Sequence, residues 1–308
     1  MTHAPTAPAL PAEKHAFDVQ LEDGATASVR VYGQGSGSNP RIISSHGNGL
    51  AADAFQSFWR LFIPDYETVV FDFRHHGRSS PFEKPIPHVW PQLIRDYDAI
   101  MKGITREIGP APSLGAFHSM SALTTLLHAS EYESPWIGIV GFEPPATPPT
   151  HYPEFQMFRA DNNRLAERTI KRRFEFNTVQ ELFDSYRRSS AFTGVDDAGL
   201  QALAASTLRW HEDKQLYELA CPREFEASIF AMQDLEGAWE RMCKVEIPVQ
   251  LVAGQPATGT SPFIIIESAF ARDGGFDFVT VDDASHFMQM EKPEECAAIV
   301  RNFHAGLG

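Results

Sequence analysis

One serine stands where a predicted strand gives way to a predicted helix. Residues 115–122 have the sequence GAFHSMSA, close to the pattern G-x-S-x-G. In that pattern a strained turn lifts the central hydroxyl above a sheet and points the next backbone amide at a reacting carbonyl. Ser119 is therefore the candidate nucleophile. Phe117 stands where a small residue is usual and needs room against a neighbouring element. A serine at this place could also simply cap the helix.

Three further segments carry groups that could serve the same site. Residues 46–49 (HGNG) follow a predicted strand, and their glycines allow a sharp turn and a close approach to a ligand. Residues 72–79 have the sequence DFRHHGRS, and residues 283–287 (DASHF) precede EKPEE at 291–295. Because histidine changes protonation near neutral pH, His286 is the candidate general base for Ser119. The side chains of His75 and His76 diverge and no further ligand completes a set, so we expect no metal site.

Taken together and in this order, these segments resemble the α/β-hydrolase superfamily. The resemblance covers about residues 17–145 and 249–303. It implies an α/β fold with a mainly parallel eight-stranded sheet flanked by helices, and catalysis through an acyl-enzyme. Ser119 would attack and His286 would transfer the proton, while the amides of Asn48 and Met120 would form the oxyanion hole. His46 is then most simply a residue that braces the loop. The resemblance implies no cofactor.

The acid that should orient His286 is not at its commonest place. In this superfamily that place is the loop after the strand 249–253, but residues 254–260 (GQPATGT) contain no carboxylate. Glu143, directly after the strand 136–142, is the candidate. A subset of the superfamily, including pancreatic-type lipases and zearalenone lactone hydrolases, carries its acid there, and parallel strands bring their carboxyl ends to one edge. Asp282 and Asp283 remain alternatives, and Glu143 could be a purely structural carboxylate.

Short apolar runs separated by helix-length segments predict the sheet that must position these residues. The runs are Arg41–Ser45, Thr68–Phe73, Ser113–His118, Trp136–Phe142, Val249–Ala253 and Phe276–Val281. Before them, Phe17–Leu21 and Ala27–Tyr32 flank Asp23-Gly24, which predicts an antiparallel hairpin at a sheet edge.

Residues 148–246 interrupt this alternation. They contain no convincing strand, only amphipathic patterns over 165–176, 179–186, 200–208 and 223–232. Residues 210–213 (WHED) have the character of a solvated helix end. We therefore predict a helical cap inserted between the sixth and seventh strands, with residues 1–147 and 247–308 forming the catalytic domain.

The cap composition indicates the kind of substrate. Four of its aromatic residues are candidates for pocket lining: Phe155, Phe158, Tyr217 and Trp239. Such a roof excludes water, which favours a bulky, fairly apolar ester or lactone. A thioesterase and a carbon–carbon bond hydrolase would use the same triad. A ligand-binding protein that has lost the chemistry is a further alternative, motivated by Phe117 and the acid-free loop.

Composition limits the partners. The chain has 308 residues, with 40 acidic and 26 basic side chains and a formal charge of −14, which disfavours nucleic acid and anionic membranes. Cys221, Cys243 and Cys296 show no paired spacing, which favours a reducing, cytoplasmic setting. Residues 1–14 predict a loose tail and not a signal peptide. We expect a small-molecule substrate, and a homodimer stays open.

Overall fold

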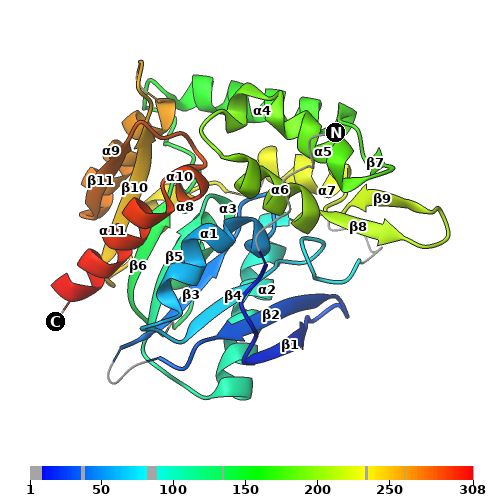
Figure 1. Ribbon diagram of the computed structural model, residues 1–308. Helices are drawn as coiled ribbons and strands as arrows, with labels where there is room; N and C mark the ends of the chain where they lie inside the picture. Colours follow the sequence, from blue (N-terminus) through cyan, green and yellow to red (C-terminus); the bar gives the residue numbers. More distant parts are fainter. Residues whose placement is uncertain are drawn as a thin grey trace.

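An eight-stranded sheet forms the centre of the computed structural model, which describes residues 9–35, 39–81, 89–133, 135–232, 235–259 and 261–307. The strand order is β1-β2-β4-β3-β5-β6-β10-β11 (Figure 1). The strands are β1 (His15–Gln20), β2 (Thr26–Tyr32), β3 (Arg41–Ser45), β4 (Thr68–Phe71), β5 (Ser113–His118), β6 (Trp136–Phe142), β10 (Val249–Gln255) and β11 (Asp277–Asp282). The predicted α/β fold is confirmed.

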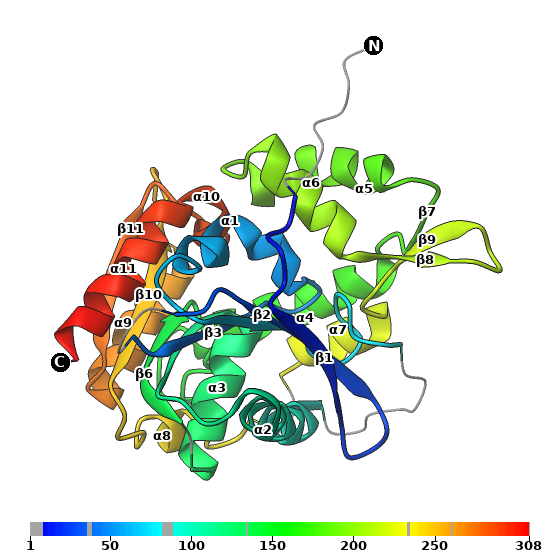
Figure 2. The same cartoon turned by 60° about the horizontal axis from the view of Figure 1, so that its bottom comes forward.

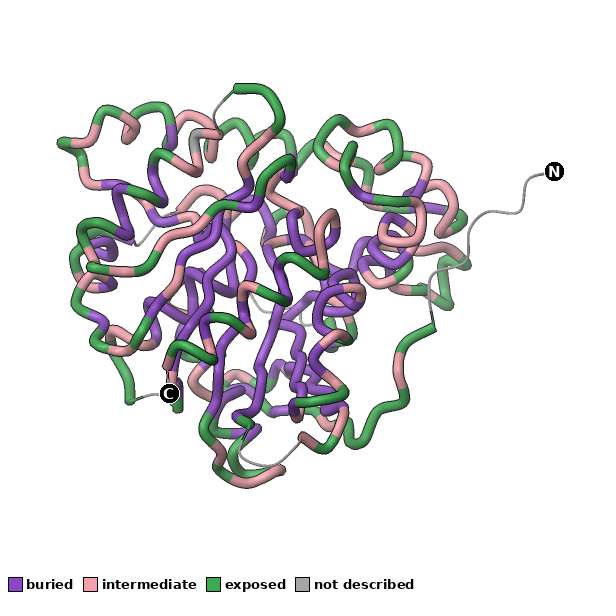
Figure 3. The backbone as a smooth tube through the Cα atoms, turned by 60° about the vertical axis from the view of Figure 1, so that its left-hand side comes forward, coloured by how far each residue is buried: buried purple, intermediate pink, exposed green. Residues whose placement is uncertain are grey.

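The pairing of the strands matches the sequence pattern. β1 pairs antiparallel with β2 at the sheet edge, which confirms the predicted hairpin, and β2 pairs antiparallel with β4. From β4 onward all neighbouring strands run parallel. Every residue of β3, β4 and β5 is buried, as expected of parallel strands covered on both faces (Figure 3).

Helices cover both faces of the sheet. The helices are α1 (Gln56–Trp59), α2 (Val89–Ile108), α3 (Met120–Glu131), α9 (Pro262–Gly274), α10 (Met288–Glu291) and α11 (Pro293–Gly306). One apolar cluster joins one face to α2, α3 and α9, and a second joins the other face to α1, α10 and α11 (Figure 2). The strands are thus fixed between two layers, so the loops at their carboxyl ends have a rigid base.

Between β6 and β10 the chain forms what we call the cap region. It contains α4 (Phe155–Lys171), α5 (Val179–Arg187), α6 (Asp197–Ser206), α7 (Arg223–Phe230) and α8 (Ala238–Met242). Figure 1 shows α4, α5 and α6 above the main sheet.

The expectation of no strand in this region was wrong. A second sheet has the order β7-β9-β8, built from β7 (Glu175–Phe176), β8 (Leu208–His211) and β9 (Leu216–Leu219). Residues 210–213, taken for a helix end, form the end of β8 and the turn that follows it. Trp210 and Tyr217 lie opposite each other with ring centroids 5.0 Å apart, although Trp210 is exposed. A cross-strand aromatic pair stabilises this hairpin. Its strands contain no buried apolar run, so the sequence pattern did not indicate them.

Two further points concern the predicted N-terminal tail and membrane-spanning helices. The first eight residues of the predicted tail lie outside the described residues. None of the helices described above is both long enough and apolar enough to cross a membrane.

Candidate active site

Ser119 lies in a sharp turn between β5 and α3. Its backbone has φ 51° and ψ −116°, a strained conformation for a residue with a side chain. The turn is held by hydrogen bonds from the Ser119 N–H to the Phe142 carbonyl (2.8 Å) and from the Leu123 N–H to the Ser119 carbonyl (3.0 Å). Met120 begins α3, so its N–H is among those that a helix start leaves without an intrahelical partner.

The room that Phe117 needs is provided by a glycine on the same strand. The Phe117 ring is fully buried and packs edge-on to Trp136, with ring centroids 5.4 Å apart. A Cβ at Gly115 would lie 2.7 Å from Phe117 Cε2, closer than real contacts allow. The missing side chain at position 115 therefore makes space for the large one at position 117.

Replacing Gly115 by alanine should consequently destabilise the protein. We expect a loss of about 1–3 kcal/mol in the free energy of unfolding, because the Phe117 ring must move within a packed core. Urea unfolding followed by fluorescence measures this loss. Gly306→Ala is the matched control, since a Cβ there meets nothing within 4 Å. Equal stability of the two variants would show that Gly115 does not create the space.

The glycine loop runs beside the candidate nucleophile. A Cβ at Gly47 would lie 2.9 Å from His118 Cδ2 and 3.2 Å from Ser119 Cβ, so only glycine permits this approach. His46 donates from Nδ1 to the Gly47 carbonyl (2.8 Å) and accepts at Nε2 from the Phe73 N–H (3.1 Å). His46 therefore braces the loop, as expected, and burial lowers its pKa.

His76 braces the same loop from the DFRHHGRS segment. Its Nε2 accepts the Gly49 N–H (3.0 Å), and its Nδ1 donates to the Arg74 carbonyl (2.9 Å). Burial lowers the pKa of His76 well below its ordinary value, so the ring stays neutral and keeps its acceptor. Among the described residues, no group of three or more His, Cys, Asp or Glu side chains is arranged to hold a metal ion.

The cap region contacts the loop through Glu226 of α7. Asn48 Nδ2 donates to the Glu226 carbonyl (2.8 Å), and a Cβ at Gly49 would lie 2.6 Å from Glu226 Oε1. The same carboxylate accepts from Arg172 Nη1 (2.8 Å). Burial raises the pKa of Glu226 to about 7, although the Arg172 charge acts in the opposite direction. The bonded link to the loop is thus the main-chain carbonyl of Glu226, and its carboxyl is a titratable group packed against Gly49.

The raised pKa of Glu226 predicts a pH-dependent stability. The folded protein binds the Glu226 proton more tightly than the unfolded chain, so the stabilising contribution is complete below pH 4.5 and is lost as the pH rises to about 7. We expect Glu226→Gln to remove this decline, which amounts to about 3 kcal/mol. Urea unfolding at several pH values measures it. Glu224→Gln, exposed on the same helix, should keep the wild-type slope; a slope unchanged in Glu226→Gln would contradict the assignment.

Glu143 and His286 are in direct contact. His286, in the loop after β11, donates from Nδ1 to Glu143 Oε2 (2.5 Å), and Glu143 Oε1 accepts the Gly254 N–H (2.9 Å). Glu143 directly follows β6, has φ 44° and is 1% exposed, whereas the His286 side chain is 28% exposed. The alternatives Asp282 and Asp283 are exposed, and neither bonds to His286 in the described part of the chain.

The EKPEE segment fixes the loop that carries His286. Glu291 accepts the Ser285 N–H (2.7 Å) and the Ser285 hydroxyl (2.6 Å). The residue pattern that identified His286 therefore has a physical reason, because these two bonds close the turn around it.

Besides its chain neighbour Phe287, two rings from other elements flank His286. His118 lies with its centroid 4.6 Å away, and Phe263 of α9 stacks at 5.1 Å with an interplanar angle of 17°. His118 is fully buried, and burial together with the nearby His286 lowers its pKa well below the ordinary value. The His118 ring therefore stays neutral beside His286. Sequence reasoning missed both neighbours, although His118 directly precedes Ser119.

The predicted site residues thus gather at one edge of the sheet. The structure joins Glu143 to His286 and sets Gly47 against Ser119. Among the hydrogen bonds of the described residues there is none between the Ser119 hydroxyl and His286. His118, next to Ser119 in the chain and 4.6 Å from His286 between ring centroids, connects the two parts of the site.

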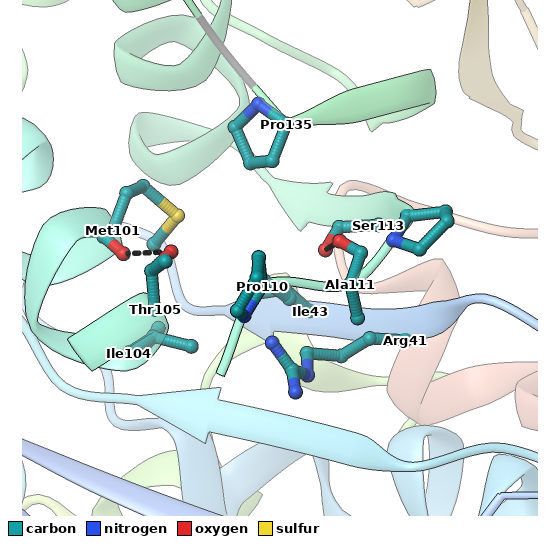
Figure 4. A pocket seen from close by; sticks show the side chains of 10 residues that line it. Arg41, Ile43, Met101, Ile104, Thr105, Pro110, Ala111, Ser113 and Pro135 are labelled. Carbon is teal, nitrogen blue, oxygen red and sulfur yellow. Dashed lines mark hydrogen bonds between the residues drawn. The ribbon is translucent and has the colours of Figure 1, made fainter. Parts of the chain in front are cut away.

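Two of the pockets on the protein are lined by residues other than Ser119, Glu143 and His286. One of about 380 Å³ is lined by Arg41 and Ser113, the first residues of β3 and β5, so it lies at the opposite end of β5 from Ser119 (Figure 4). The other, of about 810 Å³, lies within the cap region. The first of its lining residues in the chain is Thr147, four positions after Glu143. Of the four aromatic residues considered as pocket lining, Phe155, Phe158 and Trp239 line it, and Tyr217 does not.

Comparisons with known proteins agree with the fold. A model of the alpha/beta hydrolase family matches residues 42–299. E-2-(acetamidomethylene)succinate hydrolase has 18% sequence identity and a TM-score of 0.73, over 94% of this chain and 100% of that one.

Two further solved structures share the fold. The thioesterase domain from the curacin biosynthetic pathway has 16% identity and a TM-score of 0.71, over 95% of this chain and 100% of that one. A thermophilic esterase from Thermogutta terrifontis has 16% identity and a TM-score of 0.68, over 95% and 99%. A search of curated proteins finds no match to this sequence.

Proposed function

Because the chain belongs to the alpha/beta hydrolase family, we propose that it is a serine hydrolase that cleaves a carboxylic ester or lactone of a bulky, fairly apolar substrate. The observation that carries the proposal is the hydrogen bond from His286 Nδ1 to the buried carboxylate of Glu143, at the same sheet edge as the strained Ser119. A histidine fixed in this tautomer exposes Nε2 as a base, which is what a serine nucleophile requires.

The reaction would proceed through an acyl-enzyme. Ser119 Oγ attacks the carbonyl carbon while His286 Nε2 takes its proton, and the imidazolium formed is stabilised by Glu143. The amides of Asn48 and Met120 hold the negative oxygen of the tetrahedral intermediate. His286 then protonates the leaving alcohol, and a water molecule, deprotonated by His286, releases the acid and restores Ser119.

The preference for a bulky, apolar substrate rests on the cap region. Its pocket of about 810 Å³ lies in the size range of small-molecule sites and carries Phe155, Phe158 and Trp239. Initial rates on matched ester, thioester and lactone substrates with short and long acyl chains test this preference. Faster cleavage of thioesters, or of carbon–carbon bonds in vinylogous diketones, would favour one of the alternatives that use the same triad.

Phe117 and the acid-free loop after β10 are the two reasons to consider a ligand-binding protein that has lost its catalytic activity. Both features have physical explanations. Phe117 has its space from Gly115, and the acid-free loop after β10 leaves the place beside His286 to Glu143. Loss of catalysis is therefore not needed to explain either feature.

Labelling with phenylmethylsulfonyl fluoride tests the nucleophile directly. We expect a single adduct on Ser119, located by peptide mass spectrometry, because only an activated serine reacts quickly with a sulfonyl fluoride. Ser119→Ala should give no adduct, and Ser130→Ala, at the other end of α3, should react as the wild type does. An adduct on another serine, or none in the folded wild-type protein, would count against the assignment.

A further inference from the structure

A buried carboxyl group that the proposed mechanism does not use lies near the Glu143–His286 pair. Glu267 of α9 is fully buried, and both of its carboxyl oxygens lack a hydrogen-bond partner among the described residues. Burial of an unpaired polar group costs free energy, and an apolar side chain would fill the same space without that cost. Such a group next to a candidate site calls for a functional explanation.

The position of Glu267 follows from the helix that carries it. Phe263 and Glu267 are one turn apart and share a face of α9, and the Phe263 ring stacks on His286 at 5.1 Å. β10, which leads into α9, donates the Gly254 N–H to Glu143 (Figure 1). Two contacts, one from α9 and one from β10, therefore reach the same pair of residues, and besides burial the charge of Glu143 is near enough to raise the pKa of Glu267.

The surroundings decide which of the two carboxyls is charged. Glu143 accepts hydrogen bonds from His286 and from the Gly254 N–H, which stabilise its anion. Glu267 has no such donor, so burial and then the charge of Glu143 raise its pKa well above the ordinary value.

Charged groups of α9 itself gather at its C-terminal end, where Asp273 accepts hydrogen bonds from the Tyr152 hydroxyl and from Trp239 Nε1 of α8. β10 contains no titratable residue, and the two carboxyls of β11, Asp277 and Asp282, are exposed. Glu143 is the titratable group whose charge acts on Glu267. Two buried negative charges so close together are unfavourable, and the carboxyl without hydrogen-bond donors is the one that keeps its proton.

We propose that Glu267 is a positioning residue that holds this proton beside the Glu143–His286 pair and takes over the negative charge when Glu143 is neutralised. In the native protein Glu267 is a neutral acid, so His286 faces one negative charge and not two. If Glu143 loses its charge, the carboxyl of Glu267 releases its proton to solvent and becomes the counter-ion for the imidazolium. The second half of this proposal rests on the proposed function.

Infrared spectroscopy tests the protonation without any activity measurement. The difference spectrum between wild type and Glu267→Gln at neutral pH should contain the C=O stretching band of a protonated carboxylic acid, which shifts in D₂O. Glu295→Gln, exposed on α11, should remove no such band. If Glu267→Gln does not fold, Glu267→Met serves in its place. A difference spectrum that shows only a carboxylate band would overturn the proposal.

Kinetics test the transfer of charge. Glu143→Gln should keep a residual ester hydrolysis that rises with pH as Glu267 ionises. The double variant Glu143→Gln/Glu267→Gln should lose that rise and be lower at alkaline pH by about tenfold, since the imidazolium then has no negative partner. Adding Glu295→Gln to Glu143→Gln is the control and should leave the rise intact.

Equal pH profiles with and without Glu267, including equal absence of activity, would overturn the transfer of charge. Wild-type protein that cleaves none of the substrates would overturn the proposed function instead. In that case the infrared experiment, which needs no activity, still determines whether Glu267 is protonated.

Discussion

Replacement of Ser119 by alanine is expected to lower kcat by roughly a thousandfold or more, because the acyl-enzyme can no longer form. Substrate binding should change little, since the hydroxyl is one small group among the contacts of a bulky ligand. Initial rates on the best ester of the substrate panel measure kcat, and isothermal titration with Ser119→Ala measures binding.

Ser130→Ala is the control for this experiment because it removes a hydroxyl from the same helix, where the Ser130 hydroxyl donates to the Leu127 carbonyl. It should retain the wild-type rate. A Ser119→Ala protein with unchanged kcat would refute the nucleophile. A wild-type protein that binds the ligand tightly and forms no product would favour the binding-protein alternative.

Replacement of Glu143 by glutamine is expected to lower kcat by about 10³- to 10⁴-fold. The amide keeps the shape of the carboxyl but removes the charge that stabilises the His286 imidazolium, and its NH₂ group can bind the wrong tautomer. The wild-type rate, measured in parallel across pH, provides the reference.

The matched control for Glu143→Gln is Glu131→Gln at the end of α3, which removes a partly exposed carboxylate far from His286 in the chain. It should keep wild-type kcat. Loss of less than about tenfold in Glu143→Gln at neutral pH would show that another group orients His286. Near-UV circular dichroism of both variants establishes that the tertiary packing is retained.

The central sheet could be predicted from sequence because its strands carry an unambiguous physical signal. β3, β5 and β6 are short apolar runs buried on both faces, and their observed bounds equal the predicted ones. β4 ends at Phe71, two residues earlier than expected. Asp72 leaves the sheet there to accept hydrogen bonds from Arg30 (2.6 Å) and from the Ala52 N–H (2.8 Å).

The rest of the fold depends on contacts between residues distant in sequence. β8 and β9 each have four residues and are mostly half-buried, so neither contains enough apolar residues for detection by periodicity. Glu267 lies in an apolar helix with nothing in its local sequence to show that its carboxyl is buried without a hydrogen-bond partner among the described residues. Likewise, the space for Phe117 is visible only once Gly115 is known to face the ring.

The attachment of Asn48 and Gly49 to Glu226 has a consequence for the exchange of cap regions between related hydrolases. His46 and His76 hold the loop from the sheet side, and Glu226, tied to Arg172, holds it from the other. A chimera that grafts a foreign cap onto this sheet would leave the Asn48 amide without its acceptor. Because that acceptor is the main-chain carbonyl of Glu226, a compatible graft must place a backbone carbonyl at the same point beside the loop.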